Sequence, residues 1–417
     1  MKRLLLLIPT TSYRTEDFVK AAETLGVDMV IASERPSTFE AEFPEHLLTL
    51  DFTNPDKAAR TVAEFARRNP LDAVVPVDDL TTVVGAAIAK TLGLPSNPIG
   101  AVSTARNKFH TREALSQAGV ATPPFRLFSV RDDSAAAARA VARSVGYPCV
   151  LKPTILAASR GVIRANDETE FVAAFRRIAD ILEPPEVQAL GEGADQILVE
   201  GFIPGIEVAL EGLLIRGELN VLALFDKPDP LDGPFFEETI YVTPSRLPAS
   251  VQTAIARQTA EATRALGLEE GPIHAELRVN DAGPWILEVA ARSIGGLCSR
   301  TLRFGTGLTL EEIILRHALG LGVASLERER RPAGVMMIPI PRRGVLRAVR
   351  GQAEARAVPV IEEVTITAHL EQELVPLPEG LRYLGFIFAR ADTPEAVEAA
   401  LREAHRRLEF VIAPAPA

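Results

Sequence analysis

The chain has 417 residues, of which 47% are hydrophobic and 24% are charged, a composition typical of globular proteins with roughly two to four domains. Its net charge of −10, from 45 basic and 55 acidic residues, argues against binding to nucleic acid. The two cysteines, Cys149 and Cys298, lie far apart, which argues against a disulfide framework or a zinc site and favours a cytoplasmic location. The apolar run at residues 4–8 stops at Pro9, so we expect a buried strand and no membrane segment.

The first part of the chain alternates short apolar runs with segments of helical spacing. We expect strands at 3–8, 28–32, 46–50 and 73–77, and helices at 16–25, 55–68 and 80–92. This alternation is typical of a doubly wound parallel sheet, although no glycine fingerprint for a dinucleotide follows the first strand. Asp78 and Asp79 follow the fourth strand, where such sheets bind ligands, but either residue is equally suited to cap the next helix.

The second part is predicted to begin with a connector at 97–125 and to continue as an α+β unit. Lys108 opens a helix over 109–118, and we expect strands at 126–129 and 148–152 with helices at 134–145 and 171–182. Lys152 ends a strand and precedes a loop of small residues, whose backbone amides could surround an anion. Most lysines at strand ends are simply solvated, so Lys152 alone leaves both interpretations open. We expect the Pro, Gly and acid-rich segment 184–194 to be mobile.

A strand-rich unit follows from residue 196 to about residue 321 and ends in a helix over 310–319. Near its start, Glu200 and Glu207 stand on two strands joined by a bend, where they are either ligands or two surface acids. The charged run 327–332 has the composition of a linker. Residues 333–417 form a small α+β unit whose final helix, over 393–408, is capped by Thr393.

Two glutamates in the segment 273–289 constrain the chemistry most. Residues 280–283 form a predicted turn, so folding about Ala282 places Glu276 opposite Glu288. The same register pairs Leu277 with Leu287 and Val279 with Trp285. Because side chains alternate along a strand, the even-numbered positions make one polar face, which holds His274, Glu276, Arg278, Glu288 and Arg292.

Facing glutamates on a hairpin have two interpretations. Their Cβ atoms lie roughly 5 Å apart, and carboxylates that close repel each other unless a proton or a cation lies between them. Hard cations with oxygen ligands, above all Mg²⁺ carrying phosphates, suit such a pair. A solvated strand face with incidental acids is the alternative, and the segment alone leaves both open.

Taken in order, these segments resemble the ATP-grasp superfamily over nearly the whole chain. The residues similar to its nucleotide-binding set are Lys108, Lys152, the phosphate loop with Ser159, Arg160 and Gly161, the adenine hinge with Glu200, Phe202 and Ile203, and the ribose ligand Glu207. Glu276 and Glu288 match the magnesium ligands, and Arg292 matches the arginine that stabilises phosphoryl transfer. The segments 334–341 and 382–388 resemble the terminal unit of the L-amino-acid ligase type of carboxylate–amine ligase.

The resemblance implies an ATP-grasp fold of α/β and α+β domains. The expected domains are a Rossmann-like N-terminal domain with a doubly wound parallel sheet at 1–105, a small ATP-grasp subdomain at 106–195, a large subdomain with the Mg²⁺–ATP site at 196–325, and a C-terminal α+β subdomain at 333–417. Two positions depart from the family pattern. Ala290 stands where many members carry a third metal ligand, and Ala157 and Ala158 stand where the phosphate loop often has glycine.

The resemblance also implies an activity. An ATP-dependent ligase of this kind joins a carboxylate to an amine through an acyl phosphate and releases ADP and phosphate, with ATP and Mg²⁺ (or Mn²⁺) as cofactors and amino acids as the expected substrates. We expect catalytic roles for Lys152, His274 and Arg292. The candidate substrate residues are Asp79, Lys227, Glu238 and Arg300. Glu237 is an alternative to Glu238, and Arg303 is an alternative to Arg300. His274 has a structural role as its alternative, and Arg300 and Arg303 are equally suited to be surface charges.

Three other predictions remain open at this stage. A nucleotide-precursor ligase or a biotin-carboxylase-like enzyme of the same superfamily is the enzymatic alternative. A regulatory subunit that binds ATP without turnover is the alternative from another class, although the retained lysines, glutamates and Arg292 count against it. A homodimer is compatible with the sequence.

Overall fold

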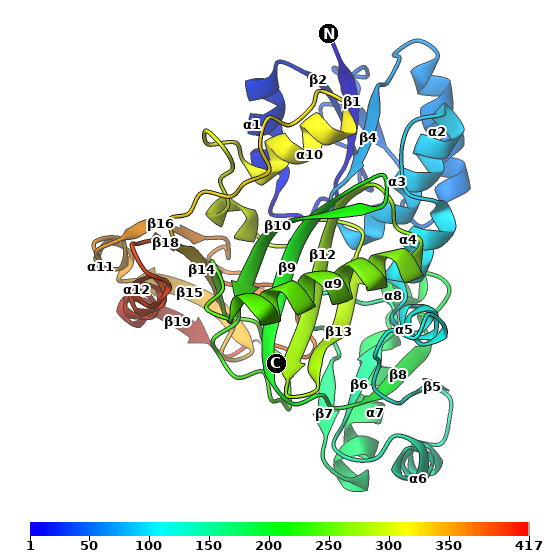
Figure 1. Ribbon diagram of the computed structural model, residues 1–417, viewed down its shortest axis with the longest axis vertical. Helices are drawn as coiled ribbons and strands as arrows, with labels where there is room; N and C mark the ends of the chain where they lie inside the picture. Colours follow the sequence, from blue (N-terminus) through cyan, green and yellow to red (C-terminus); the bar gives the residue numbers. More distant parts are fainter. Residues whose placement is uncertain (416–417) are drawn as a thin grey trace.

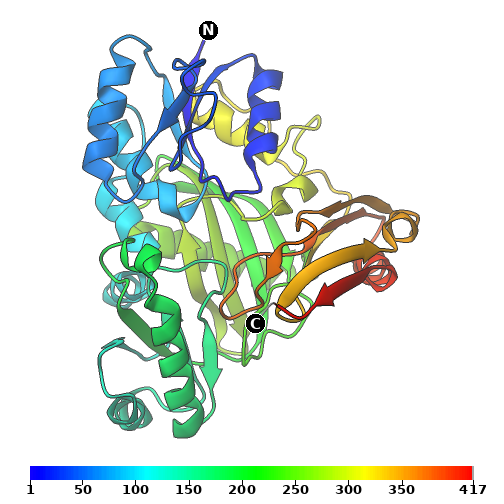
Figure 2. The same ribbon diagram turned by 180° about the vertical axis from the view of Figure 1, so that it is seen from behind.

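Four β-sheets organise residues 1–415, which are the residues that the computed structural model describes (Figures 1 and 2). The N-terminal sheet is parallel, in the order β3 (Leu47–Thr49), β2 (Asp28–Ser33), β1 (Arg3–Leu7) and β4 (Ala73–Pro76). Helices α1 (Thr15–Leu25), α2 (Pro55–Ala66) and α3 (Asp79–Leu92) connect these strands. Its central strand β1 is a continuous apolar run because both faces of the sheet are covered. The predicted parallel sheet is confirmed.

Two helices connect this unit to the rest of the chain, whereas the sequence predicted only the second. They are α4 (Ile99–Arg106) and α5 (Lys108–Gln117), separated by Asn107 alone. The Asn107 side chain caps α5 by accepting hydrogen bonds from the amides of Phe109 (2.9 Å) and His110 (3.3 Å). This cap fixes Lys108 as the first residue of α5.

The next unit is a small antiparallel sheet. Its order is β5 (Phe125–Ser129), β8 (Gln196–Gly201), β6 (Cys149–Pro153) and β7 (Ile163–Ala165). Helices α6 (Ser134–Ser144) and α7 (Glu168–Leu182) pack against it around the buried rings of Phe128, Phe171 and Phe175. Strand β7 was not predicted, and the segment expected to be mobile contains the short helix α8 (Pro185–Gln188).

The largest sheet has eight antiparallel strands within the described part of the chain and is continuous across the middle and C-terminal parts of the sequence. Its order is β13 (Gly283–Ala290), β12 (Gly271–Asn280), β9 (Ile206–Ile215), β10 (Glu218–Asp226), β11 (Ile240–Thr243), β14 (Ala333–Ile338), β18 (Gly385–Arg390) and β16 (Ile361–Ile366). Helix α9 (Ala249–Leu266) lies across one face (Figure 1), and α10 (Leu310–Ala318) lies on the other with the N-terminal unit.

The side chains of β9 show how the two faces of this sheet alternate. Val208 and Leu210 pack into the core beneath α9, whereas Ala209 and Leu213 pack into the core beneath α10. Both faces of the central strands are therefore buried, which explains why β9 has an almost uninterrupted apolar sequence.

The C-terminal unit adds a second small sheet, in the order β17 (Glu373–Leu374), β15 (Gly344–Arg350) and β19 (Glu409–Ala413). Helices α11 (Gln352–Arg356) and α12 (Pro394–Arg407) complete it, and the Thr393 hydroxyl accepts from the Ala396 amide (3.2 Å), so the predicted cap is confirmed. The domain boundaries stay a prediction, since β8 pairs with the small sheet and β14 extends the large one. In the described residues, no helix is both long enough and apolar enough to cross a membrane.

The hairpin of β12 and β13 follows the predicted register only in part. Glu276 lies opposite Glu288, as predicted, but the register shifts between Glu276 and Leu277. Leu277 therefore pairs with Ile286, and the predicted pairs Leu277–Leu287 and Val279–Trp285 are wrong. The cause is a β-bulge, in which the extra residue Leu287 is left without a partner. As a result Ile286 is fully buried, while Leu287 lines a cavity.

Candidate active site

A cavity of about 420 Å³ lies where the units meet, and most of the residues predicted to be functional line it. It is bounded by the segments after β1 and β4, the loop after β6, the end of β8, the hairpin of β12 and β13, and residues of β14 and the segment before β18. The predicted residues that line it are Asp79, Lys108, Lys152, Ser159, Glu200, Phe202, Ile203, Glu207, Glu238, His274, Glu276, Glu288 and Arg292. Their individual roles stay predictions.

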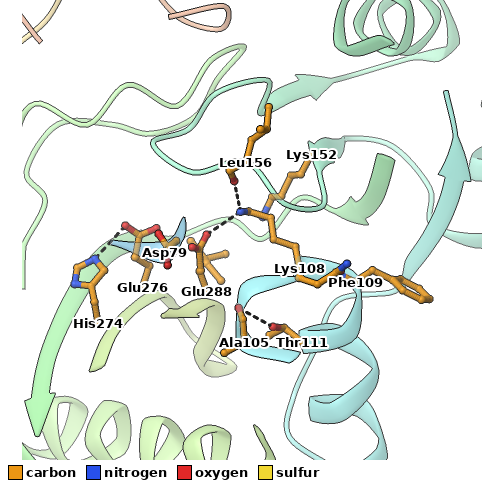
Figure 3. A network of polar contacts seen from close by, with 12 residues as sticks. Asp79, Ala105, Lys108, Phe109, Thr111, Lys152, Leu156, His274, Glu276 and Glu288 are labelled. Carbon is orange, nitrogen blue, oxygen red and sulfur yellow. Dashed lines mark hydrogen bonds and ion pairs between the residues drawn. The ribbon is translucent and has the colours of Figure 1, made fainter. Parts of the chain in front are cut away.

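Lys108 and the two facing glutamates all line the cavity and lie close to one another (Figure 3). The Lys108 Nζ atom donates a hydrogen bond to the carbonyl of Leu156 (2.7 Å) and lies 3.4 Å from Glu288 Oε2. The side chains of Glu276 and Glu288 are 23% and 30% exposed, so both carboxylates are accessible from the cavity. Two facing carboxylates beside an ammonium group form a donor set that fits a hard divalent cation bound to phosphates.

Lys152 is held by a buried carboxylate. Glu200 contacts the Lys152 ammonium group with one oxygen and accepts from Arg112 Nε with the other (2.7 Å). Burial alone would raise the pKa of Glu200, but Arg112 and Lys152 lower it to about 2. The Glu200 side chain therefore positions Lys152, and only the backbone of Glu200 remains for the adenine hinge that the sequence predicted.

The loop after β6 has an unusual backbone. Ala158 (φ 56°), Ser159 (φ 54°) and Gly161 (φ 73°) all adopt left-handed conformations, which cost about 1–2 kcal/mol at residues other than glycine. Gly161 is required for space as well, because a Cβ atom there would lie 2.6 Å from Pro153. The loop thus adopts a strained backbone in spite of its alanines. The Arg160 Nε atom donates to the Glu379 carbonyl (3.0 Å), and Arg160 is not among the described residues that line the cavity.

Lys227 follows β10 and lies among three carboxylates. Its Nζ atom donates to Glu207 (2.9 Å), Glu276 (3.1 Å) and Glu238, and its side chain is only 2% exposed. Burial would lower the pKa of Lys227, but the three carboxylates raise it well above its usual value. Burial and the neighbouring Glu276 charge raise the pKa of Glu238 to about 7.

Two sets of carboxylates are thus candidates for a metal ion. Glu207, Glu238 and Glu276 have ligand atoms within 4.8 Å of one another, but the ammonium group of Lys227 lies among them and contacts all three carboxylates. Glu288 has only the longer contact with Lys108. The facing pair Glu276 and Glu288 therefore remains the better fit for a divalent cation. Ala290, which lies opposite His274, offers no side-chain oxygen.

His274 is buried between two carboxylates. Its Nδ1 atom contacts Glu211, and its Nε2 atom lies 3.5 Å from Glu276 Oε1 (Figure 3). Burial would lower the pKa of His274, but Glu211 and Glu276 raise it to about 9. The imidazolium form donates from both nitrogens, so the geometry favours a role in orienting Glu276 over a role as a general base.

Arg292 is paired with Asp79, a candidate substrate residue. The Arg292 Nε and Nη2 atoms donate to Asp79 Oδ2 (3.0 and 2.9 Å). Burial would raise the pKa of Asp79 and lower that of Arg292, but their mutual attraction reverses both shifts. Asp78 is the N-cap of α3, and its amide donates to Thr81 Oγ1 (3.2 Å).

Several predicted residues lie elsewhere. Arg300 contacts Asp17 (3.0 Å) and Glu363 (2.8 Å), and it is not among the described residues that line the cavity. Arg303 likewise donates to backbone carbonyls outside the cavity. The structure therefore does not support a substrate role for Arg300 or Arg303. Arg300 connects the 3₁₀ turn at Cys298–Thr301 to Asp17, and Arg303 donates back to the Arg300 carbonyl in the same turn.

Four buried charged residues around the cavity had no role in the sequence-based prediction, which placed only Arg278 on the polar face of the hairpin. Arg278 contacts Glu207 (3.1 Å) and the Ile203 carbonyl (3.0 Å), and its guanidinium group lies over the Phe202 ring. The other three are Arg14, Arg112 and Glu211. The alternation along β9 was a usable signal for Glu211, since it shares a face with Glu207.

Comparisons with known proteins agree with this geometry. An ATP-grasp N-terminal domain matches residues 19–96, an ATP-grasp domain matches residues 145–301, and the L-amino acid ligase C-terminal domain 2 matches residues 336–413. The crystal structure of L-amino acid ligase from Bacillus licheniformis is similar with a TM-score of 0.84 and 28% identity, over 99% of each chain.

Two curated relatives are similar over shorter regions. Alanine–anticapsin ligase of Bacillus subtilis (strain 168) is 27% identical over 64% of this chain and 58% of its own length. Carnosine synthase 1 of Gallus gallus is 29% identical over 82% of this chain but only 39% of its own length. ATP-grasp enzymes bind ATP with Mg²⁺. The cavity, the domain order and the ligase-type terminal unit together show that the chain is an ATP-grasp enzyme of the L-amino acid ligase family.

Proposed function

We propose that this enzyme joins the carboxylate of one amino acid to the amine of another. The carboxylate takes the γ-phosphoryl group of ATP, and the amine then displaces phosphate from the acyl phosphate, which leaves an amide, ADP and phosphate. One observation carries the proposal: a single cavity contains the lysines and facing glutamates suited to a triphosphate, the arginine suited to a carboxylate, and walls from the terminal unit of amino acid ligases.

The phosphate end of the cavity is the region around Lys108, Lys152, Lys227, Glu276 and Glu288. The ammonium groups of Lys108 and Lys152 there neutralise the charge that develops on the phosphoryl group during transfer, while Lys227 holds the carboxylates around it. In the loop after β6 the amides of residues 160–162 already donate to carbonyls, so we assign the phosphate contact to residues 156–159, which line the cavity. Because the ammonium groups are fixed by ion pairs, they need little reorganisation at the moment of reaction.

Glu276 and Glu288 would hold Mg²⁺, with Mn²⁺ as an alternative. When bound, the ion supplies Lewis-acid stabilisation of the phosphate oxygens. His274 lies beside Glu276, and the contact between its Nε2 atom and Glu276 Oε1 (3.5 Å) orients the carboxylate. Ala290 leaves the protein with two ligands in the hairpin, so we expect bound ATP to supply much of the remaining coordination.

At the nucleotide end, we assign the adenine to the apolar walls made by Phe202, Ile203 and Leu287. Arg278 stacks on Phe202 and fixes Glu207, the predicted ribose ligand. Glu207 has one oxygen on Lys227 and the other on Arg278, so its orientation is fixed before a nucleotide arrives.

The acceptor end is the region around Asp79, Arg292 and the segment 294–296. The planar fork of Arg292 can grip a carboxylate or an acyl phosphate, and Asp79 holds that fork in place. The eight-stranded sheet and the C-terminal unit add apolar walls through Tyr241, Met337 and Tyr383. These walls exclude the water that would hydrolyse the intermediate. Glu238 lies beside Lys227, where it suits an amino group.

The test is a screen of L-amino acid pairs with purified enzyme, ATP and Mg²⁺. ADP release is measured first, and the mass of the product is then measured for the active pairs. An amide of the two amino acids formed in proportion to ADP supports the proposal. ADP release with bicarbonate or a ribosylamine, and none with amino acids, would instead favour the nucleotide-precursor or carboxylase alternative. ATP binding without any ADP would favour the regulatory subunit.

A further inference from the structure

Two buried ionised side chains hold the cavity wall directly after Arg292. Ile294, Gly295 and Gly296 form this wall, and the backbone of Ile294 is tied at both of its polar atoms. Its carbonyl accepts from Arg14, and its amide donates to Glu211. Neither Arg14 nor Glu211 is among the described residues that line the cavity, so both act on the wall from behind.

Arg14 reaches the wall from the N-terminal unit, where it precedes α1. Its Nη1 atom donates to Ser293 Oγ (2.6 Å) and to the Ile294 carbonyl (3.1 Å), while Nη2 donates to Glu311 on α10 (2.6 Å). The residue is 1% exposed and its guanidinium group lies over the Phe18 ring. A planar fork that serves three acceptors at once fixes their relative positions, which an ammonium group cannot do.

Glu211 reaches the same wall from β9 and is fully buried. Its Oε2 atom accepts from the Ile294 amide (3.1 Å), and its Oε1 atom contacts His274, which lies beside the metal ligand Glu276. One carboxylate therefore contacts both the wall at the acceptor end and the residue that orients Glu276 at the phosphate end.

We propose that Arg14 and Glu211 are positioning residues that keep the segment 292–296 aligned with the incoming amine, and that they thereby couple ATP consumption to amide formation. The inference rests on the function proposed above. In the productive step a bond forms between the amine nitrogen and the acyl carbon, the carbon–oxygen bond to phosphate breaks, and the proton of the amine leaves with phosphate or solvent. In the wasteful step water attacks the same carbon, so ADP is made without an amide.

A misplaced wall should affect these two steps differently. A displacement of about 1 Å can slow a reaction between two bound groups about 100-fold, because it spoils their alignment. Transfer of the phosphoryl group uses Lys108 and Lys152, neither of which contacts Arg14. Loss of the Arg14 contacts should therefore slow amide formation more than acyl phosphate formation. A larger share of the acyl phosphate should then be hydrolysed by water.

The experiment measures the ratio of ADP to amide product in the intact enzyme with its best amino acid pair. We expect Arg14→Lys, which keeps the charge but loses the fork, to raise this ratio about tenfold and to raise the acceptor KM, with the ATP KM changed less than about twofold. Ser293→Ala, which removes only one tether, should raise the ratio by a smaller factor. Glu311→Gln is the matched control, because it changes the other partner of Arg14 while both contacts to the wall remain.

The outcomes separate a positioning role from a purely structural one. If Arg14→Lys and Ser293→Ala lower ADP and amide in equal proportion, or change neither, the proposal is overturned. Should Arg14→Lys fail to fold, Ser293→Ala gives the same ratio test, and a wild-type ratio in that variant overturns the proposal. If the wild-type enzyme makes no amide from any amino acid pair, the proposed function fails instead, which is a distinct result.

Discussion

At the phosphate end of the cavity each functional side chain lies in a short segment with a recognisable pattern of its own, whereas the wall at the acceptor end depends on contacts between residues as many as 280 positions apart. Glu276 and Glu288 share one hairpin, and Lys152 begins the loop that follows its own strand. Arg292 instead depends on Asp79 from the N-terminal unit, and the wall after it depends on Arg14 and Glu211. Segments with their own pattern can be identified in the sequence, but contacts such as those of Arg14 and Glu211 with the segment after Arg292 cannot.

The strongest way to test the phosphate end is to remove one charge from the hairpin. We expect Glu288→Gln to reduce ADP release about 1,000-fold, because a neutral amide stabilises a divalent cation far less than a carboxylate does. ATP binding should weaken only modestly, since the lysines and the loop remain. The measurement is steady-state ADP release together with ATP titration. Glu218→Gln, on the exposed start of β10, should leave both unchanged; equal turnover in the two variants would remove Glu288 from the metal site.

The second prediction concerns the fold around Lys152. Glu200 has a pKa of about 2 in the folded protein, against an ordinary value of 4.5, so its contribution is present above about pH 4.5 and is lost as the pH falls through 2. We expect Glu200→Gln to lower the free energy of unfolding by about 3 kcal/mol at pH 7, since Arg112 and Lys152 lose their partner. The difference from wild type should shrink in acid. Urea denaturation at pH 7 and pH 3 measures it, and a pH-independent difference would contradict the assignment.

At the acceptor end, two arginines make a matched pair. Arg292→Lys should reduce amide formation about 100-fold, because a point charge cannot replace a bidentate fork in the cavity. Arg300→Lys should have little effect on catalysis, because Arg300 contacts Asp17 and Glu363 away from the cavity. Initial rates of amide formation measure both variants. Similar losses in the two would show that Arg292 acts through the fold and not through the substrate.

The smallest expected effect is in the loop after β6. Ala158→Gly relieves a left-handed backbone but increases the freedom of the unfolded chain, and each effect is worth about 1 kcal/mol, so the free energy of unfolding should change little. Ala157→Gly is the control, because Ala157 is not among the described residues with positive φ, and it should destabilise by about 0.5–1 kcal/mol. Thermal unfolding compares them. If Ala158→Gly lost more stability than Ala157→Gly, the backbone strain at Ala158 would be contradicted.

Prediction from the sequence succeeded within single segments and failed for contacts between distant units. The parallel N-terminal sheet was predictable because fully buried strands have continuous apolar sequences, and the pairing of Glu276 with Glu288 followed from the turn and the alternation of side chains. The bulge at Leu287 was not predictable, since spacing alone does not show which residue leaves the ladder. Arg300 was misplaced because its partners, Asp17 and Glu363, are brought to it only by the packing of three units.

The bulge in β13 lets one short hairpin contribute side chains to both the core and the cavity. In a regular strand, Ile286 and Glu288 would share a face, but the extra residue between them turns Ile286 toward the core and Glu288 toward the cavity. The carbonyl of Leu287 accepts from Arg112 (2.8 Å), which also holds Glu200. Substitutions of Leu287 can therefore reshape the cavity wall during evolution without touching core packing. A deletion there would make Ile286 and Glu288 neighbours in a regular ladder, which keeps each on its own face and removes only the extra position that faces the cavity.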